Sequence, residues 1–132
     1  MKRKIQSTLS ALLILSIFVT AFGSAQAARV TPRYTGIATL TAALTISDTG
    51  KATCNGKAIL WSGYTADVTV ELKQDGVTIK TWTSSGSDMV SAGGTYYVAS
   101  GHEYVVTTTA TVYDSTGKEI ESPSKDSLTK NY

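Results

Sequence analysis

The chain has 132 residues, with twelve lysines and arginines, ten aspartates and glutamates, one histidine and one cysteine. We expect one domain, because a chain of this size has little room for a second. A single histidine and a single thiol exclude a zinc site made of several His and Cys ligands from one chain. No stripe of basic residues in the body of the chain indicates nucleic-acid binding.

Residues 1–27 have the organisation of a secretory signal peptide. Three basic residues at positions 2–4 precede the apolar run "LSALLILSIFVTAFG", which ends in "SAQA" with Ala25 and Ala27 at the −3 and −1 positions of a cleavage site. We therefore predict cleavage after Ala27 and secretion into the extracellular space, with an uncleaved anchor as the alternative. Without the leader, nine basic residues face ten acidic ones, so the net charge changes from +2 to −1.

An extended segment, residues 28–36, precedes the domain that we expect over residues 37–132. From Ile37 onward apolar residues recur with a period of two, and Thr, Val and Tyr are abundant. This pattern is typical of half-buried antiparallel strands. No segment after the leader has the period of an amphipathic helix, so we predict an all-β domain.

The first hairpin places the only cysteine in the interior. The loop 48–50, Asp-Thr-Gly, suits a type I turn closed by Gly50 in the left-handed region. The predicted pairs are Ile46 with Ala52, Leu44 with Cys54, Leu40 with Ala58, and Ala38 with Leu60. All these residues then share one face, whereas a slip of one residue would turn Lys51 and Lys57 inward. We predict that Cys54 is a buried, unreactive thiol; an intermolecular disulfide and a reactive thiol are the alternatives.

The second hairpin, "TADVTVELKQDGVTIKTW", turns at Asp75 and Gly76, the strongest short hairpin signal. An even loop sets Leu72 opposite Ile79, Glu71 opposite Lys80, Val70 opposite Thr81, and Thr69 opposite Trp82. A three-residue loop would set Leu72 against Lys80. The even loop is favoured because it pairs apolar residues with apolar residues and residues of opposite charge with each other. This register predicts that Trp82 points outward.

A third hairpin follows in "EYVVTTTATVYDSTGKEIES". Its inward residues are Tyr104, Val106, Ala110 and Val112. The loop 115–117 ends in Gly117, as the first hairpin's loop ends in glycine, and it sets Val112 opposite Ile120. Residues 87–100 are predicted to form one or two short strands, whose register we leave open. The total of about seven strands predicts a single antiparallel β-sandwich.

The stretch "SGHEYVV" followed by "VYDSTGKEIES" resembles the end of a fibronectin type III or related immunoglobulin-like domain, where a Gly-x-x-Tyr corner leads into the penultimate strand. The resemblance implies that the Tyr104 hydroxyl bonds to the backbone between Val98 and Gly101. The cysteine pair and inward tryptophan of those families are missing. The whole pattern also resembles small secreted uncharacterised proteins of Gram-positive bacteria, which share the leader, "L-x-I-S-x-x-G-K-A-x-C" and a closing "Y-x-V-x-x-x-A-x-V-Y". That resemblance implies a fold and a compartment but no activity.

Few residues suggest catalysis, and we expect no enzyme. His102 lies in the corner loop while Cys54 lies on an early strand, so a Cys-His nucleophile is not predicted. Glu119 and Glu121 flank Ile120 and are typical of a solvated face. No loop gathers the oxygen ligands of a calcium ion. We therefore expect no cofactor and no metal.

The remaining candidate is a binding surface. If the second and third hairpins share a sheet, Thr69, Trp82, Thr111 and Tyr113 lie on its outward face. Its aromatic rings would stack on a sugar or anchor a protein, or simply shield the backbone as strand-forming residues do. A row of exposed aromatic rings would favour sugar, and an isolated tryptophan ringed by charge would favour protein.

We therefore expect a secreted, non-enzymatic interaction module with an extracellular protein partner. The alternative is a small carbohydrate-binding sandwich with a glycan ligand. We expect a monomer with no nucleic-acid partner, which meets the membrane only through its leader before cleavage.

Overall fold

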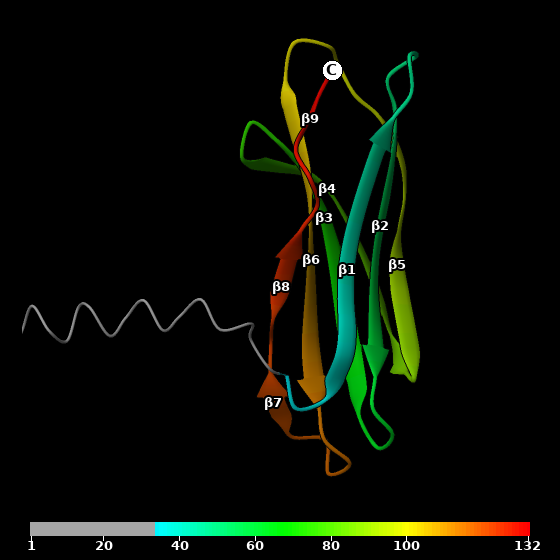
Figure 1. Cartoon of the computed structure of the whole chain (residues 1–132), viewed down its shortest axis with the longest axis vertical. Coiled ribbons are helices and arrows are strands. Elements are labelled where there is room, and N and C mark those ends of the chain that lie inside the picture. Colours follow the sequence, from blue (N-terminus) through cyan, green and yellow to red (C-terminus); the bar gives the residue numbers. More distant parts are fainter. Residues whose placement is uncertain (1–33) are drawn as a thin grey trace, which may run out of the picture. The chain divides into compact units, whose positions relative to one another are not determined.

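The computed structural model describes residues 34–132 (Figure 1). The predicted signal peptide, its cleavage after Ala27 and most of the segment 28–36 lie outside the described residues. Within them the chain forms antiparallel strands and no helix, so the all-β prediction is confirmed. Accordingly, no membrane-spanning helix occurs in the described part.

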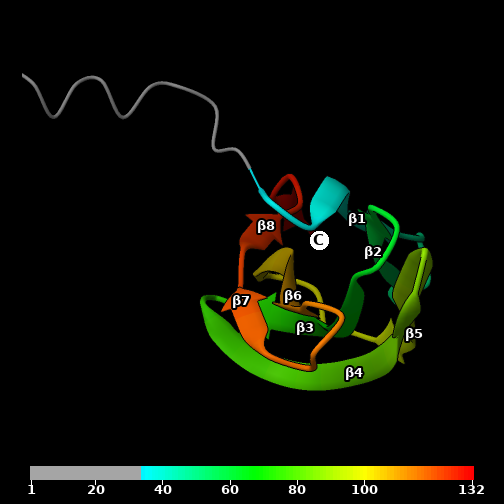
Figure 2. The ribbon, with the colours of Figure 1, turned by 90° about the horizontal axis from the view of Figure 1, so that it is seen from below.

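The strands form two sheets. They are β1 (Ile37–Ile46), β2 (Lys51–Leu60), β3 (Thr65–Gln74), β4 (Val77–Ser87), β5 (Met89–Tyr97), β6 (Glu103–Tyr113), β7 (Glu119–Glu121), β8 (Ser124–Asp126) and β9 (Lys130–Asn131). The smaller sheet has the order β1-β2-β5 and the larger the order β4-β3-β6, with the short strands β7, β8 and β9 along the far edge of β6. β4 curves along the larger sheet and ends beside β5 (Figure 2).

The apolar sides of both sheets enclose one core. The buried members include Leu40, Leu44, Cys54 and Leu60 from the smaller sheet and Val68, Val70, Leu72, Tyr104, Val106 and Val112 from the larger. Burying each of the larger aliphatic side chains contributes about 1.5–3 kcal/mol. The sheets approach closely at Gly56, where a Cβ atom would lie 2.5 Å from Val70 Cγ2 and closer still to Thr108 Oγ1.

The first hairpin has the predicted register from Leu40 to the turn. Leu44 faces Cys54, and the Cys54 side chain is only 2% exposed, so the predicted burial of the thiol is confirmed. The predicted pair of Ala38 with Leu60 is wrong. A bulge between Ile37 and Thr39 leaves Ala38 exposed and sets the larger Ile37 against Leu60 in the core.

The second hairpin departs from its predicted register just beyond the turn. Gln74 pairs with Val77 across the two-residue loop, but a bulge between Leu72 and Lys73 then sets Leu72 opposite Lys80. From there every pair is shifted by one, and Trp82 lies opposite Val70. The predicted pairs of Leu72 with Ile79 and of Thr69 with Trp82 are therefore wrong.

The third hairpin also contains a bulge. Tyr104, Val106, Ala110 and Val112 are buried as predicted, but Val112 lies opposite Glu121 and not opposite Ile120, which is partly exposed. The Glu121 carboxylate accepts hydrogen bonds from the backbone amides of Thr35 (3.2 Å) and Gly36 (2.6 Å). These bonds explain why the carboxylate takes this position and the apolar side chain does not.

Residues 87–100 contain one continuous strand, β5, which pairs with β2. Asp88, with a φ of 62°, lets the chain pass from β4 in the larger sheet to β5 in the smaller. Gly93 has a φ of 140°, and a Cβ atom there would overlap the carbonyl oxygen of Cys54. The predicted turn glycines Gly50, Gly76 and Gly117 each have a φ of 84°.

Candidate functional site

The predicted binding face exists in part. β3 pairs with β6, so the second and third hairpins do share a sheet. Thr69 lies opposite Thr109, and Thr111 lies opposite Asp67, with Tyr113 at the end of the same outward row on β6. We call the outward side of β3, β4 and β6 the hydroxyl face, because threonine and serine dominate it.

Trp82 does not belong to the hydroxyl face. It is partly buried against the core, and its Nε1 lies so close to Gly94 that a Cβ atom there would be 2.6 Å away. The Lys80 ammonium lies 5.9 Å from the centre of its ring, a cation–π distance. The prediction that Trp82 points outward is therefore wrong.

Hydrogen bonds across the strands occupy much of the hydroxyl face. Asp67 accepts hydrogen bonds from Ser85 (2.7 Å) and from the Tyr113 hydroxyl (3.1 Å), and the second of these raises the pKa of Tyr113 above its ordinary value. The other pairs are Thr78 with Glu71, Thr107 with Asp126, Thr109 with Ser124, and Thr111 with Ser122. Side chains that already bond to one another have fewer groups free for a ligand.

The outer side of the smaller sheet has a different character. Ile59 (36% exposed) and Met89 (60% exposed) lie directly opposite each other on β2 and β5. Lys57 follows in the next outward row of β2, and Lys51 lies opposite Tyr97, which is 69% exposed. Neither lysine side chain forms a salt bridge with another described residue. We call this surface the β2–β5 face.

Sequence reasoning missed the β2–β5 face because the register of residues 87–100 was open. The alternation of the first hairpin turns Ile59 outward, which is a signal in the sequence. Met89 could not be placed beside it without knowing that β5 pairs with β2. Trp61, 56% exposed, follows directly after β2, in a stretch whose pattern indicates only a loop.

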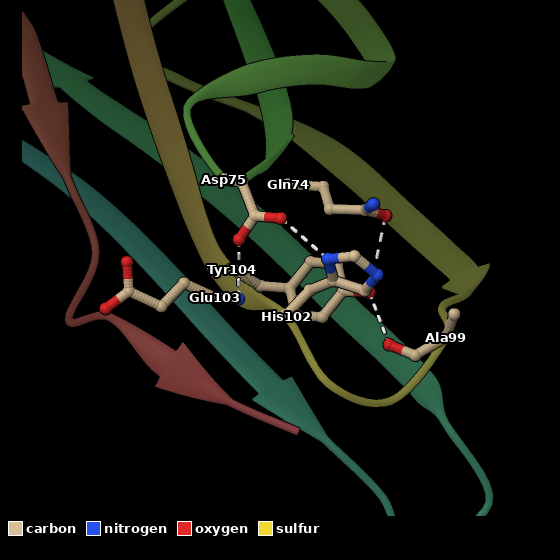
Figure 3. Close-up of polar contacts among 6 residues, drawn as sticks. All are labelled: Gln74, Asp75, Ala99, His102, Glu103 and Tyr104. Carbon is tan, nitrogen blue, oxygen red and sulfur yellow. Dashed lines mark hydrogen bonds and ion pairs between the residues drawn. The ribbon is translucent and has the colours of Figure 1, made fainter.

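A polar cluster joins two loops at one end of the domain (Figure 3). The Asp75 carboxylate lies 2.6 Å from His102 Nδ1 and accepts a 3.0 Å hydrogen bond from the Glu103 amide. Both contacts lower the pKa of Asp75 below its ordinary value, and the hydrogen bond from the Glu103 amide has the larger effect. The Tyr104 hydroxyl donates to the carbonyl of Ala99, within the predicted stretch, so this corner contact is confirmed.

The polar cluster borders an open hollow of about 490 Å³, lined also by Gly101, Asn131 and Tyr132. An Asp–His pair orients an imidazole in many hydrolases, but a nucleophile must lie within its reach. The protein's thiol does not serve, because Cys54 is buried in the core and burial raises its pKa to about 11. The polar contacts of the cluster fasten the β3–β4 turn to the corner before β6.

The part of the chain that the structure describes contains no group of three or more His, Cys, Asp or Glu residues placed to hold a metal ion. No model of a known protein family matches the chain, and no curated protein matches it. A function for the chain is therefore inferred from its surfaces alone.

Proposed function

We propose that the chain is an exported, non-enzymatic interaction module that binds a protein partner through its β2–β5 face. The observation that carries this proposal is the pairing of Ile59 with Met89, two exposed apolar side chains side by side on adjacent strands. Apolar side chains that are surrounded by polar groups are typical of the centre of protein interfaces. The leader in residues 1–27 supports export.

The fold that we propose is a sandwich of the immunoglobulin-like or fibronectin type III-like kind. Its strand order supports this, because the first, second and fifth strands share one sheet while the third and sixth share the other. Immunoglobulin-like domains divide their strands in the same way. The bond from Tyr104 to Ala99 is a second supporting feature, since it matches the tyrosine corner of such domains.

A protein partner is favoured over a glycan by the kind of side chain on the β2–β5 face. Ile59 and Met89 have no flat ring for a sugar to stack on, and the exposed ring of Tyr97 lies apart from them at the other end of β5. The glycan alternative depended on an outward Trp82 beside Tyr113, and Trp82 lies inward. The lysines at positions 51 and 57 add positive charge that no described acidic side chain pairs with, and this charge suits a partner with acidic residues around an apolar patch.

The test compares two double variants in a binding assay. The chain, secreted under its own leader, is immobilised and used to capture partners from the medium and surface fraction of the producing cells. We expect Ile59→Thr with Met89→Thr to lose a protein that the unchanged chain retains. The control, Val77→Thr with Leu128→Thr, removes two exposed apolar side chains away from this face and should keep it.

The same samples on a glycan array separate the two candidate functions. Glycan binding that survives Ile59→Thr with Met89→Thr would contradict the proposal, as would equal capture by both double variants. Each double variant should unfold within about 1 kcal/mol of the unchanged chain, because the altered side chains are at the surface. A larger loss of stability in either variant would require single substitutions instead.

A further inference from the structure

The two sheets differ in charge. The strands of the smaller sheet, β1, β2 and β5, contain lysines at positions 51 and 57 and no acidic residue. The strands of the larger sheet contain lysines at positions 73, 80, 125 and 130, but they also contain acidic residues. These are Asp67, Glu71, Glu103, Glu119, Glu121 and Asp126. The smaller sheet is therefore the basic side of the domain.

The lysines of the smaller sheet have no acidic partner within the described part of the chain. Asp48 in the β1–β2 turn and Asp88 before β5 are close in the sequence, but neither forms a salt bridge with Lys51 or Lys57. Lys130, which lines the hollow of about 220 Å³ at the edge of β1, adds a third ammonium group without a salt bridge. Most acidic groups of the larger sheet accept hydrogen bonds within the domain, namely those of Asp67, Glu71, Glu121 and Asp126.

The alternation of β2 sets the lysines at regular distances from the exposed apolar pair. The even residues of β2 are buried, so its odd residues lie on the outer side of the sheet. Successive residues on one side of a strand are about 7 Å apart. Lys57 is therefore one such step from Ile59, which has Met89 opposite it. Lys51 is three steps farther along the strand, about 20 Å from Lys57.

Between the two lysines, the outer side of the smaller sheet carries only short side chains. Two rows of the ladder lie there, and their residues are Ala43, Asn55 and Gly93, and Thr45, Thr53 and Thr95. A bound chain can approach the sheet closely over this stretch, with an ammonium group at each end of it. An extended segment fits such a stretch, because the side chains on one of its sides repeat at the same distance of about 7 Å.

We propose, resting on the function proposed above, that the protein partner contributes an acidic segment that lies extended along β2. An apolar side chain of this segment contacts Ile59 and Met89. Two residues away along the segment, an aspartate or glutamate meets Lys57. A second acidic residue, six residues beyond the first, meets Lys51. The charges fix the register of the segment on the sheet and steer its approach, and the apolar contact supplies affinity.

The test uses a library of random twelve-residue peptides displayed on phage. Twelve extended residues span about 40 Å, which exceeds the distance of about 27 Å from Ile59 to Lys51. Peptides are selected on the immobilised chain, secreted under its own leader. We expect the selected peptides to combine a large apolar residue with Asp or Glu two residues away. Selection on Lys57→Glu should instead enrich Lys or Arg at that place, because the charge it meets is reversed.

Fluorescence anisotropy then measures the affinity of a selected peptide. Lys57→Gln should weaken binding by at least about threefold, and the loss should shrink in about 0.5 M salt, which screens the charges. The matched control, Lys73→Gln, removes a lysine that is also partly exposed but lies on the larger sheet, and it should leave the affinity unchanged. Ile59→Thr with Met89→Thr should weaken binding at both salt concentrations. Far-UV circular dichroism checks that all variants fold.

The outcomes separate the acidic partner from the proposed function. A selection that yields no peptide, or only peptides without acidic residues, would overturn the acidic partner, as would equal affinities of Lys57→Gln and Lys73→Gln. If such peptides still lost binding in Ile59→Thr with Met89→Thr, the β2–β5 face would remain the binding surface and only the acidic chemistry would be wrong. Self-association of the chain that this double variant abolished would identify a second copy as the occupant and would also overturn the inference.

Discussion

The first and second hairpins have similar signals in the sequence, but only the first keeps the predicted register over most of its length, from Leu40 to the turn. Each has strict alternation and a turn glycine with a φ of 84°, at Gly50 and Gly76. In the first, the ladder runs without interruption from the turn to Thr39. In the second, a bulge shifts it after two pairs. The turn therefore determines only the first pairs, and packing determines the pairs farther along the strands.

The second hairpin gains core contact from its bulge. Without it, Ile79 would face the core and Trp82 would face solvent. A bulge sets two residues of one strand against one of the other. Both Ile79 and Trp82 now pack against the core, and the intervening Lys80 lies over the indole ring.

The largest effect on stability is expected from a substitution that removes this core contact. Trp82→Ala should lower the free energy of unfolding by about 2–3 kcal/mol, somewhat less than for a fully buried tryptophan. Urea unfolding followed by circular dichroism measures it, with Trp61→Ala as the control. Trp61 is exposed and should change stability by no more than about 0.5 kcal/mol. If both substitutions had equally small effects on stability, the position of Trp82 against the core would be contradicted.

The next effect belongs to the first hairpin, at Gly56. Gly56→Ala should destabilise the domain by about 2 kcal/mol, because the new methyl group overlaps Val70 and Thr108 of the opposite sheet. Gly86→Ala on β4 is the matched control, since a Cβ atom there would be 3.6 Å from the nearest heavy atom, Val90 Cγ2. It should be neutral or stabilise slightly. If the two variants gave the same urea midpoint, the close approach of the sheets would be contradicted.

A smaller effect concerns the corner that holds the turn of the second hairpin. Tyr104→Phe should cost about 1–2 kcal/mol, because the Ala99 carbonyl loses its donor and the side chain is fully buried. Tyr97→Phe removes a hydroxyl from an exposed ring and should cost almost nothing. An unchanged midpoint for Tyr104→Phe would show that the corner bond contributes no net stability.

The sequence predicted the alternation, the turns and the corner, and its three register errors have one cause. Bulges lie next to Ile37, Leu72 and Val112, and each error begins at one of them. Binary patterning and turn chemistry depend on near neighbours in the chain, so they can be read from the sequence. A bulge forms where contacts with residues far away in the sequence stabilise it. An example is the bulge beside Val112, where the Glu121 carboxylate accepts hydrogen bonds from the Thr35 and Gly36 amides before β1.

The candidate surfaces also differ in how far the sequence could predict them. Thr69, Thr111 and Tyr113 were assigned correctly to one face, because alternation along each strand decides which way they point. The β2–β5 face depends on a pairing between strands about thirty residues apart, for which no turn supplies the register. The positive φ of Asp88, which redirects the chain toward the smaller sheet, has no clear signal in the sequence.

The smallest effect compares the turn aspartates of the two hairpins as the pH falls. The Asp75 carboxylate is bonded to the Glu103 amide and to His102, and its pKa lies below the ordinary value of 3.8. The unfolded chain therefore takes up this proton at a higher pH than the folded chain does. The stability that Asp75 contributes is complete above its unfolded pKa and is lost as the pH falls through its folded pKa.

Asp75→Asn should thus lower the urea midpoint at pH 7, and the difference from the unchanged chain should shrink as the pH falls below about 4. Asp48→Asn, in the turn of the first hairpin, is the control, because the Asp48 carboxylate accepts no hydrogen bond from another described residue. Its midpoint should follow that of the unchanged chain across the acid range. If the urea midpoint of Asp75→Asn also followed that of the unchanged chain across the acid range, the bonds from Asp75 to the corner would contribute nothing to stability. The turn of the second hairpin would then add nothing to the packing of Trp82 and Ile79, whereas the turn of the first is bonded to the domain through its backbone, from the Tyr132 hydroxyl to the Asp48 carbonyl and from the Val98 amide to the Gly50 carbonyl.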